Sequence, residues 1–318
     1  MKAIDLFAGA GGFSTGAQLA GCDVVWAANH WPDAVEWHTR NHPTTDHLCQ
    51  DLHQADWSRV PEHDIMLASP CCQGHSKARG KLSGNPQHDA SRSTAWAVVS
   101  AAEYHRPSVI VVENVPEFRD WSLYPAWSQA MDTLGYSLSH CVLDAADHGA
   151  PQHRQRLFII LTRSMSGVVL ELPKQPHIPA SSFLNFDHTR PGNMGGWSPV
   201  NKPGRSLATL ARVARGRQAF GDRFIMPYYG SGSGLTGRSI DRPIGTLTTR
   251  ARWAVVNGDR MRMVSTTEAR AAMTFPDTYQ IPSNVMLANH LLGNAVCPEP
   301  VRHLINAIYG SWHFAGYL

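Results

Sequence analysis

The stretch STAWAVVSAAEYHRPSVIVVEN, residues 93–114, places a segment of helical character directly before a run of β-branched residues. Comparable apolar runs recur at residues 2–7, 22–28, 63–68 and 156–161. Short apolar runs that alternate with helical segments favour a mainly parallel, doubly wound sheet. We therefore predict an α/β fold, in which ligands bind beyond the carboxyl ends of the strands.

The pattern changes from residue 164, where Pro, Gly and Arg become frequent and strands become hard to identify. Regular patterning returns with STTE (265–268), which is typical of a capping box, and Pro298 can open a last helix. We predict a sheet domain whose two parts are residues 1–163 and 266–318. A smaller, irregular domain is inserted between them at residues 164–265.

The net charge of +3 hides an uneven distribution. Between Arg163 and Arg260 there are 14 Lys and Arg residues against 5 Asp and Glu, whereas the remainder has 14 against 20. A basic block within an otherwise acidic chain indicates a region that meets a polyanion, with a solvated basic face as the alternative.

The composition, with 43% hydrophobic and 17% charged residues, is that of a globular protein. No apolar run approaches the roughly 20 residues that a membrane helix needs, and the N-terminus lacks the features of a secretory signal. We therefore expect a cytoplasmic protein with no membrane partner. The six cysteines form no C-x-x-C pair, so no metal site is expected despite 17 histidines.

The segment DLFAGAGGFS (5–14) follows the first predicted strand. Its glycines allow a turn to approach a ligand, but Ser14 stands where the third glycine of G-x-G-x-x-G would be, so the dinucleotide fingerprint is not met. From the residues alone, a cofactor loop and ordinary helix-entry glycines both remain open.

Three further polar groups lie at the ends of predicted strands. SPCCQGHS (69–76) follows one strand, and Glu113 ends a second, apolar strand, where a carboxylate needs either a partner or a function. Arg154 and Arg156 directly precede a third strand and could hold an acid, a phosphate or a base edge. A salt-bridged core acid and ordinary surface arginines are the alternatives.

Together these motifs resemble those of the DNA (cytosine-5)-methyltransferase family, in unpermuted order over nearly the whole chain. The nucleophile motif is similar to residues 69–76, the base-binding acid motif to ENV (113–115), and the Q-x-R-x-R motif to QHRQR (152–156). The other matches are residues 5–14 with the first cofactor motif, CQDL (49–52) with the acidic turn after the third strand, and RPIGTLTTR (242–250) and LGNAV (292–296) with the last two motifs. The resemblance implies a Rossmann-like methyltransferase sheet with an inserted target-recognition domain at 164–265.

The resemblance also implies catalytic roles. Cys72 would add as a thiolate to position 6 of a flipped-out cytosine, which makes position 5 nucleophilic toward a methyl sulfonium. Glu113 would share a proton with the ring nitrogen N3, Arg156 would hold the O2 edge, and Arg154 would brace the loop or a phosphate. Because the family's nucleophile directly precedes the glutamine, we interpret Cys71 as a small apolar filler, with a spare nucleophile and a redox partner as the alternatives.

S-adenosylmethionine is the implied methyl donor. Phe7 would lie against its adenine, the turn at Gly9 and Gly11 would pass the methionine moiety, and Asp51 with Leu52 would meet the adenine amine. The other expected cofactor contacts are Pro70, Asn294 and Val296. The family's second strand usually ends in an acid that holds the ribose, but Asn29 occupies the position that we align with it, and weaker cofactor binding is our hypothesis.

Double-stranded DNA is the implied partner, bound by a monomer. The predicted nucleic-acid contacts are Lys77 and Arg79 in a basic loop (75–88), and Arg212, Arg215, Arg217, Arg238 and Arg242 in the basic block. A tRNA cytosine methyltransferase and a catalytically silent DNA-binding relative are the alternatives, although the silent relative should have lost the thiol, the acid or the arginines. The sequence reveals neither the target site nor whether the activity serves restriction-modification, phage protection or regulation.

Overall fold

A computed structural model describes residues 1–71, 94–163, 170, 172–187, 196–228 and 236–314. The chain divides into two compact units. The first consists of Met1–Asp144, Gln155–Lys174 and Val296–Leu318, and the second of Ala145–Arg154 and Gln175–Ala295. Each unit is described by itself.

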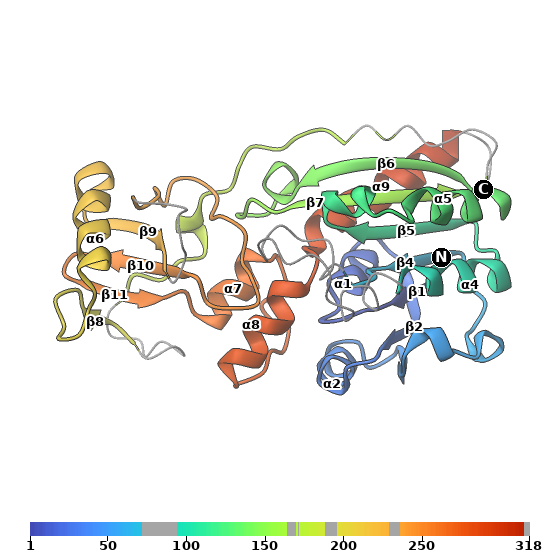
Figure 1. Cartoon of the computed structure of the whole chain (residues 1–318), viewed down its shortest axis with the longest axis horizontal. Coiled ribbons are helices and arrows are strands. Elements are labelled where there is room, and N and C mark those ends of the chain that lie inside the picture. The colour runs from blue at the N-terminus through green and yellow to red at the C-terminus, as the bar shows by residue number, and fades with distance from the viewer. Residues whose placement is uncertain (72–93, 164–169, 171, 188–195, 229–235, 315–318) are drawn as a thin grey trace. The chain divides into compact units, whose positions relative to one another are not determined.

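The first unit is built on a sheet with the strand order β3-β2-β1-β4-β5-β7-β6 (Figure 1). Its strands are β1 Lys2–Leu6, β2 Asp23–Asn29, β3 Asp46–Cys49, β4 Ile65–Ala68, β5 Val109–Asn114, β6 Ser137–Asp144 and β7 Gln155–Thr162. The pairings among β1 to β5 are parallel, which confirms the predicted mainly parallel α/β sheet. Strands β3 and β6 were not among the five predicted runs.

Strand β7 is antiparallel to both of its neighbours, β5 and β6. Because its direction is reversed, β7 begins at the edge of the sheet where β5 ends. The register pairs Glu113 with Phe158 and Asn114 with Leu157. The polar end of β5 and the arginine-rich start of β7 therefore meet.

Helices cover both faces of this sheet, as Figure 1 shows. Helices α1 (Gly12–Leu19) and α9 (Pro298–Phe314) pack on the face that includes Ile65 and Leu67 of β4. Helices α4 (Ala95–His105) and α5 (Tyr124–Thr133) pack on the face that includes Met66, while α2 (Pro32–Asn41) contacts β2 and β3. Burial of each such apolar side chain contributes roughly 1.5–3 kcal/mol, so the sheet is rigidly held from both sides.

The second unit contains an antiparallel sheet with the order β8-β11-β10-β9. Its strands are β8 Ser198–Pro199, β9 Arg223–Pro227, β10 Trp253–Asn257 and β11 Arg260–Met263, and its helices are α6 Leu207–Phe220, α7 Thr266–Ala272 and α8 Val285–Asn294. The region that we expected to be irregular is therefore partly regular. Short strands with charged residues, such as RMRM in β11, obscure the alternation by which strands are recognised.

The expected helix boundaries after residue 264 agree with the structure. Ser265 caps α7 and Glu268 completes a reciprocal capping box, and α9 begins at Pro298. The division into domains at residues 163 and 265 stays a prediction, and the compact units group residues 266–295 with the inserted segment instead. No helix among the described residues is both long and apolar enough to span a membrane.

Candidate active site

Glu113 and Arg156 form an ion pair where β5 ends and β7 begins. The Arg156 Nε atom lies 2.9 Å from the Glu113 Oε1 atom, and the two side chains are only 17% and 9% exposed. Both point to the same face of the sheet because Arg156 lies two positions before Phe158, the register partner of Glu113. A carboxylate this buried needs such a partner, since an unpaired buried charge costs several kcal/mol.

Arg154 has different surroundings from Arg156. Its side chain is 2% exposed, and its guanidinium donates to the backbone carbonyls of Leu247, Gly293 and Ala295 at 3.0, 2.9 and 2.6 Å. These contacts join the segment of Arg154 to Leu247 and to the segment Gly293–Ala295, all in the second unit. Bracing a loop and holding a phosphate were the two roles considered for Arg154, and these contacts suit bracing.

The last two motifs pack directly against each other in the second unit. A Cβ atom at Gly293 would lie 2.3 Å from the backbone of Thr248 and Thr249, so only glycine fits this approach. Gln152 adds to the same arrangement because its Oε1 accepts from Leu247 N at 2.8 Å and its Nε2 donates to Ala272 O at 3.2 Å. Gln152 belongs to the Q-x-R-x-R motif, yet the sequence had suggested no role for it.

Asn114 anchors the chain just before the expected nucleophile. Its side chain is buried and donates to the Pro70 carbonyl at 3.0 Å. The Cys71 backbone N–H donates to Thr94 Oγ1 at 3.1 Å, and the Cys71 side chain is half-buried. Pro70, which we expected to contact the cofactor, is thus a fixed point of the nucleophile segment. Cys72, Lys77, Arg79 and the loop 75–88 lie outside the described residues.

The expected cofactor turn has an unusual backbone. Phe7, Gly9 and Gly11 have φ angles of 63°, 55° and 77°, in the left-handed region that disfavours residues with a Cβ atom. The positive φ of Phe7 is a strained conformation of the kind that persists where the surroundings demand it. Phe7 and Gly9 are half-exposed, so the turn offers an aromatic face and open backbone to a ligand.

Helix α1 is fixed behind this turn by residues of the C-terminal segment. A Cβ atom at Gly12 would lie 2.1 Å from the Val296 carbonyl oxygen, so the backbones are in close contact. Val296, an expected cofactor contact, is therefore buried beside the start of α1. Asn294, the other expected contact from this motif, is exposed at the end of α8 in the second unit.

The polar groups expected at the adenosine lie at the ends of β2 and β3. Asp51 is exposed and accepts from the backbone N–H of His53, which together with the His53 ring lowers the pKa of the Asp51 carboxyl; Leu52, the next residue, is buried. Asn29 is 9% exposed, and its Oδ1 accepts from Trp31 N at 2.9 Å. His30 had not been predicted, but it is exposed and its charge also lowers the pKa of Asp51.

Taken together, these groups suit S-adenosylmethionine. A half-exposed aromatic ring, a glycine turn, an ionised carboxylate and an amide are groups that can hold a nucleoside joined to an amino acid. The assignment of each residue to the cofactor stays a prediction.

The arginines that we expected to contact DNA fall into two groups. Arg212 Nη1 donates to the Pro227 carbonyl at 2.7 Å, Arg217 contacts Asp222 and Asp259 at 3.7 and 3.2 Å, and Arg238 lies 5.1 Å from the centre of the Trp253 ring. The side chains of Arg215 and Arg242 are exposed. All five belong to the second unit, and their contacts with a nucleic acid stay predictions.

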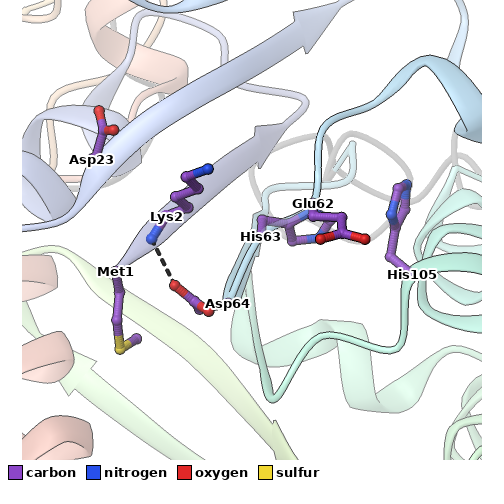
Figure 2. Close-up of a pocket in the computed structure, with 7 residues that line it drawn as sticks. All are labelled: Met1, Lys2, Asp23, Glu62, His63, Asp64 and His105. Carbon is purple, nitrogen blue, oxygen red and sulfur yellow. Dashed lines mark hydrogen bonds between the residues drawn. The ribbon is translucent and has the colours of Figure 1, made fainter.

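A polar pocket lies at the opposite edge of the first unit's sheet (Figure 2). It is lined by Met1, Lys2, Asp23, Glu62, His63, Asp64 and His105. Lys2 and Asp23 begin β1 and β2, whereas Glu113 and Asn29 stand at strand ends. The backbone N–H of Lys2 donates to Asp64 at 2.8 Å. None of the predicted site residues lines this pocket.

The sheet and the polar groups at its carboxyl edge define an α/β methyltransferase. The family model for C-5 cytosine-specific DNA methylases matches residues 1–193 and 205–310. The type II methyltransferase M.HhaI of Haemophilus parahaemolyticus is 26% identical to the chain, and the match covers 100% of the chain and 97% of that protein. M.AgeI of Thalassovita gelatinovora is 28% identical over 190 residues, which is 56% of the chain and 43% of that protein.

Solved structures share the fold at lower sequence identity. A DNA modification methyltransferase encoded within an Escherichia coli prophage superposes with a TM-score of 0.72 at 18% identity, covering 98% of the chain and 99% of the other. A Dnmt2 variant of Spodoptera frugiperda gives 0.71 at 16% identity, covering 97% and 99%.

The chain belongs to the C-5 cytosine-specific DNA methylase family. It is an enzyme that methylates cytosine in DNA at position 5, and it uses S-adenosylmethionine as the methyl donor.

Proposed function

We propose that Cys72, Glu113 and Arg156 carry out cytosine C5 methylation on a base flipped out of double-stranded DNA, with Arg154 bracing the motif segments of the second unit. The observation that carries this proposal is the buried Glu113–Arg156 pair. It sets an acid and a planar, multiply donating cation side by side at the carboxyl edge of the sheet, where the N3 and O2 atoms of one cytosine could be bound together.

The residue roles follow from the electronic demands of the ring. The Cys72 thiolate forms a bond to C6, and the electrons of the C5–C6 double bond move into the ring. Glu113 shares a proton with N3 and so prevents negative charge from building up there, while Arg156 donates to O2. Bound S-adenosylmethionine supplies an electrophilic methyl group on a sulfonium. Loss of the C5 proton and of the thiolate then restores the aromatic ring.

Two further residues fix segments within their own units. Asn114 fixes the Pro70 carbonyl two residues before Cys72, and Arg154 fixes the segments around Leu247 and Gly293. Positioning of this kind matters because a misplacement of about 1 Å can cost on the order of a hundredfold in rate.

Duplex DNA as the substrate, a monomeric enzyme and a cytoplasmic location are parts of the same proposal. The basic block supports a polyanionic partner, and the type II relatives support a place in a restriction-modification system. A tRNA substrate is the second candidate, because one branch of the family that the sequence resembles uses this scaffold on RNA.

Comparing methyl transfer to duplex DNA with methyl transfer to tRNA tests the proposal. The purified protein is incubated with labelled S-adenosylmethionine and each nucleic acid, and a methylation-free host expressing the gene is examined by bisulfite sequencing. We expect C5 methylation at one short DNA motif and none on tRNA. Transfer to tRNA alone would overturn the DNA assignment. The variant Glu113→Gln should lose methyl transfer to DNA. Its control is Glu36→Gln, which alters an exposed carboxylate paired with Arg40.

A further inference from the structure

A chain of four polar side chains runs through the interior of the first unit. Asp5 Oδ2 lies 2.7 Å from Ser14 Oγ, Ser14 Oγ lies 3.0 Å from His38 Nε2, and His38 Nδ1 lies 2.7 Å from His47 Nε2. The four residues come from β1, α1, α2 and β3. None of them has a part in the catalytic roles proposed above.

This chain is connected to the expected cofactor turn in two independent ways. Ser14 lies in the first turn of α1, three residues after Gly11, and its backbone N–H donates to Asp5 Oδ2 at 3.1 Å. Asp5 thus provides the cap that Gly11 cannot supply. In addition, His38 and His47 line the same narrow crevice as Gly9 and Asn29. A displacement of either histidine would therefore alter the packing beside the turn.

The interior position makes the hydrogen bonds among Asp5, Ser14 and His38 costly to lose, whereas His47 is half-buried. Asp5 and Ser14 are fully buried, and His38 is 1% exposed, so water cannot replace a missing partner. Burial raises the pKa of Asp5 to about 7 and lowers the pKa of His38 well below its ordinary value.

The hydrogens in this chain must be arranged in a consistent direction. If Asp5 is protonated, it donates to Ser14, Ser14 donates to His38 Nε2, and His38 Nδ1–H donates to His47. If His47 is doubly protonated, every donation is reversed and ends on the Asp5 carboxylate, with the same number of protons. The reversed arrangement also exists with one proton fewer, when neutral His47 carries its hydrogen on Nε2 and Asp5 is ionised. With one proton more than in the first two arrangements, two donors face each other at one contact. Added protons therefore break a contact of the chain.

Other titratable groups surround the chain. The ring of His42, the C-cap of α2, lies 4.4 Å from the His38 ring, and Asp46 on β3 acts on His47. His42 is not a member of the chain, because it contacts Thr15 at 3.4 Å and Gln18 at 2.9 Å. No group of three or more His, Cys, Asp or Glu residues in the described part of the chain is placed to hold a metal ion. The 2.7 Å separation of His38 Nδ1 and His47 Nε2 is that of a hydrogen bond.

We propose that His38 is a positioning residue for S-adenosylmethionine binding, which acts through Ser14 and Asp5 to hold the turn at Gly9 and Gly11 and makes cofactor affinity depend on pH. This inference rests on the proposed function, because it takes that turn as the cofactor site. Removing the Ser14 hydroxyl breaks the chain in the middle. The turn then loses its connection to α2 and β3, although the backbone cap from Asp5 remains.

The test is calorimetric titration of the full-length protein with S-adenosylmethionine and with its demethylated product, from pH 5.5 to 8.5. For Ser14→Ala and His38→Gln we expect dissociation constants about tenfold higher than wild type near neutral pH, with kcat at saturating cofactor and the KM for DNA within twofold. His42, the C-cap of the same helix, is buried to a similar extent. His42→Gln is therefore the matched control and should bind within twofold of wild type. The wild-type affinity should fall toward acidic pH, and Ser14→Ala should flatten that dependence.

Each outcome bears on the inference. Unchanged affinity and an unchanged pH profile in Ser14→Ala would overturn it, even if His38→Gln fails to fold. A lower melting temperature with unaltered affinity would reduce His38 to a structural role and also overturn it. If the wild-type protein binds no S-adenosylmethionine, the proposed function itself fails, and the two failures are therefore distinguishable.

Discussion

Glu113 Oε1 and Arg156 Nε lie 2.9 Å apart because β7 runs against β5, which brings the start of one strand to the end of the other. An acid after one parallel strand and an arginine before another would lie at opposite edges of the sheet. The reversal of β7 thus places both groups in the same site.

Glu113→Gln should leave DNA and cofactor binding largely intact while slowing methyl transfer by two decades or more. The amide keeps the shape of the side chain but cannot share a proton with N3 when the ring's charge develops. Single-turnover kinetics beside filter binding measure the two effects separately. Wild-type turnover would remove Glu113 from the mechanism.

Substitutions at Arg154 and at Arg156 should have different effects on stability and on activity. Arg154→Ala leaves three buried carbonyls without their donor, and we expect a loss of about 3 kcal/mol or more in the free energy of unfolding. Arg156→Lys keeps a cation beside Glu113, so the unfolding free energy should change by less than about 1 kcal/mol while activity falls at least tenfold. Urea denaturation and initial rates compare the two variants. A stable Arg154→Ala protein would contradict the bracing role.

Much of the first unit could be predicted from sequence because its strands are buried on both faces. β5 and β7 contain nearly continuous apolar runs, which are typical of strands buried on both faces. β3 and β6 escaped because few of their residues are fully buried. The antiparallel direction of β7 could not be predicted either, because a short apolar run does not indicate the direction of its strand.

The site was predictable where a motif fixes a chemical role, and less so where geometry decides. Arg154 and Arg156 look alike in sequence, but one is enclosed by carbonyls and the other pairs with an acid. The histidines of α2 and β3 carry no motif at all. Their connection to Ser14 arises only when four elements fold together.

Acid should destabilise the protein between about pH 6.5 and pH 4. Burial lowers the pKa of His42 and of His63 from 6.5 to about 4 and also lowers the pKa of His38 well below 6.5. The unfolded chain therefore binds more protons in this range, so stability is present above pH 6.5 and is lost as the pH falls. For His42 this corresponds to about 3 kcal/mol at most. The pKa of Asp5 is raised to about 7, so Asp5 alone would make stability increase as the pH falls. It is one group, whereas three histidines contribute to the loss of stability.

Urea midpoints at pH 7.5 and 5.0 measure this loss. His63→Gln, which removes one buried titrating ring far from the expected cofactor turn, should narrow the difference between the two midpoints. Equal midpoints for the wild-type protein would contradict the neutral state of the buried histidines.

The paired cysteines should differ in covalent trapping. On DNA carrying 5-fluorocytosine the final elimination lacks a removable proton, so the enzyme stays attached through its nucleophile. Cys71→Ala should still trap and methylate, whereas Cys72→Ala should do neither. Denaturing gels of the complexes give the readout. The reverse pattern would exchange the two assignments, and trapping by both variants would show that either thiol can react.

The arginines of the second unit should contribute unequally to DNA binding. Arg215 and Arg242 are exposed, so replacing both by Ala should reduce the slope of log affinity against log salt by about 2. Arg212 donates to the Pro227 carbonyl, and Arg212→Ala should therefore lower the unfolding free energy by roughly 1 kcal/mol or more. Fluorescence anisotropy from 50 to 200 mM salt, beside urea denaturation, distinguishes the two effects. A salt slope unchanged by the double replacement would mean that this basic face is merely solvated.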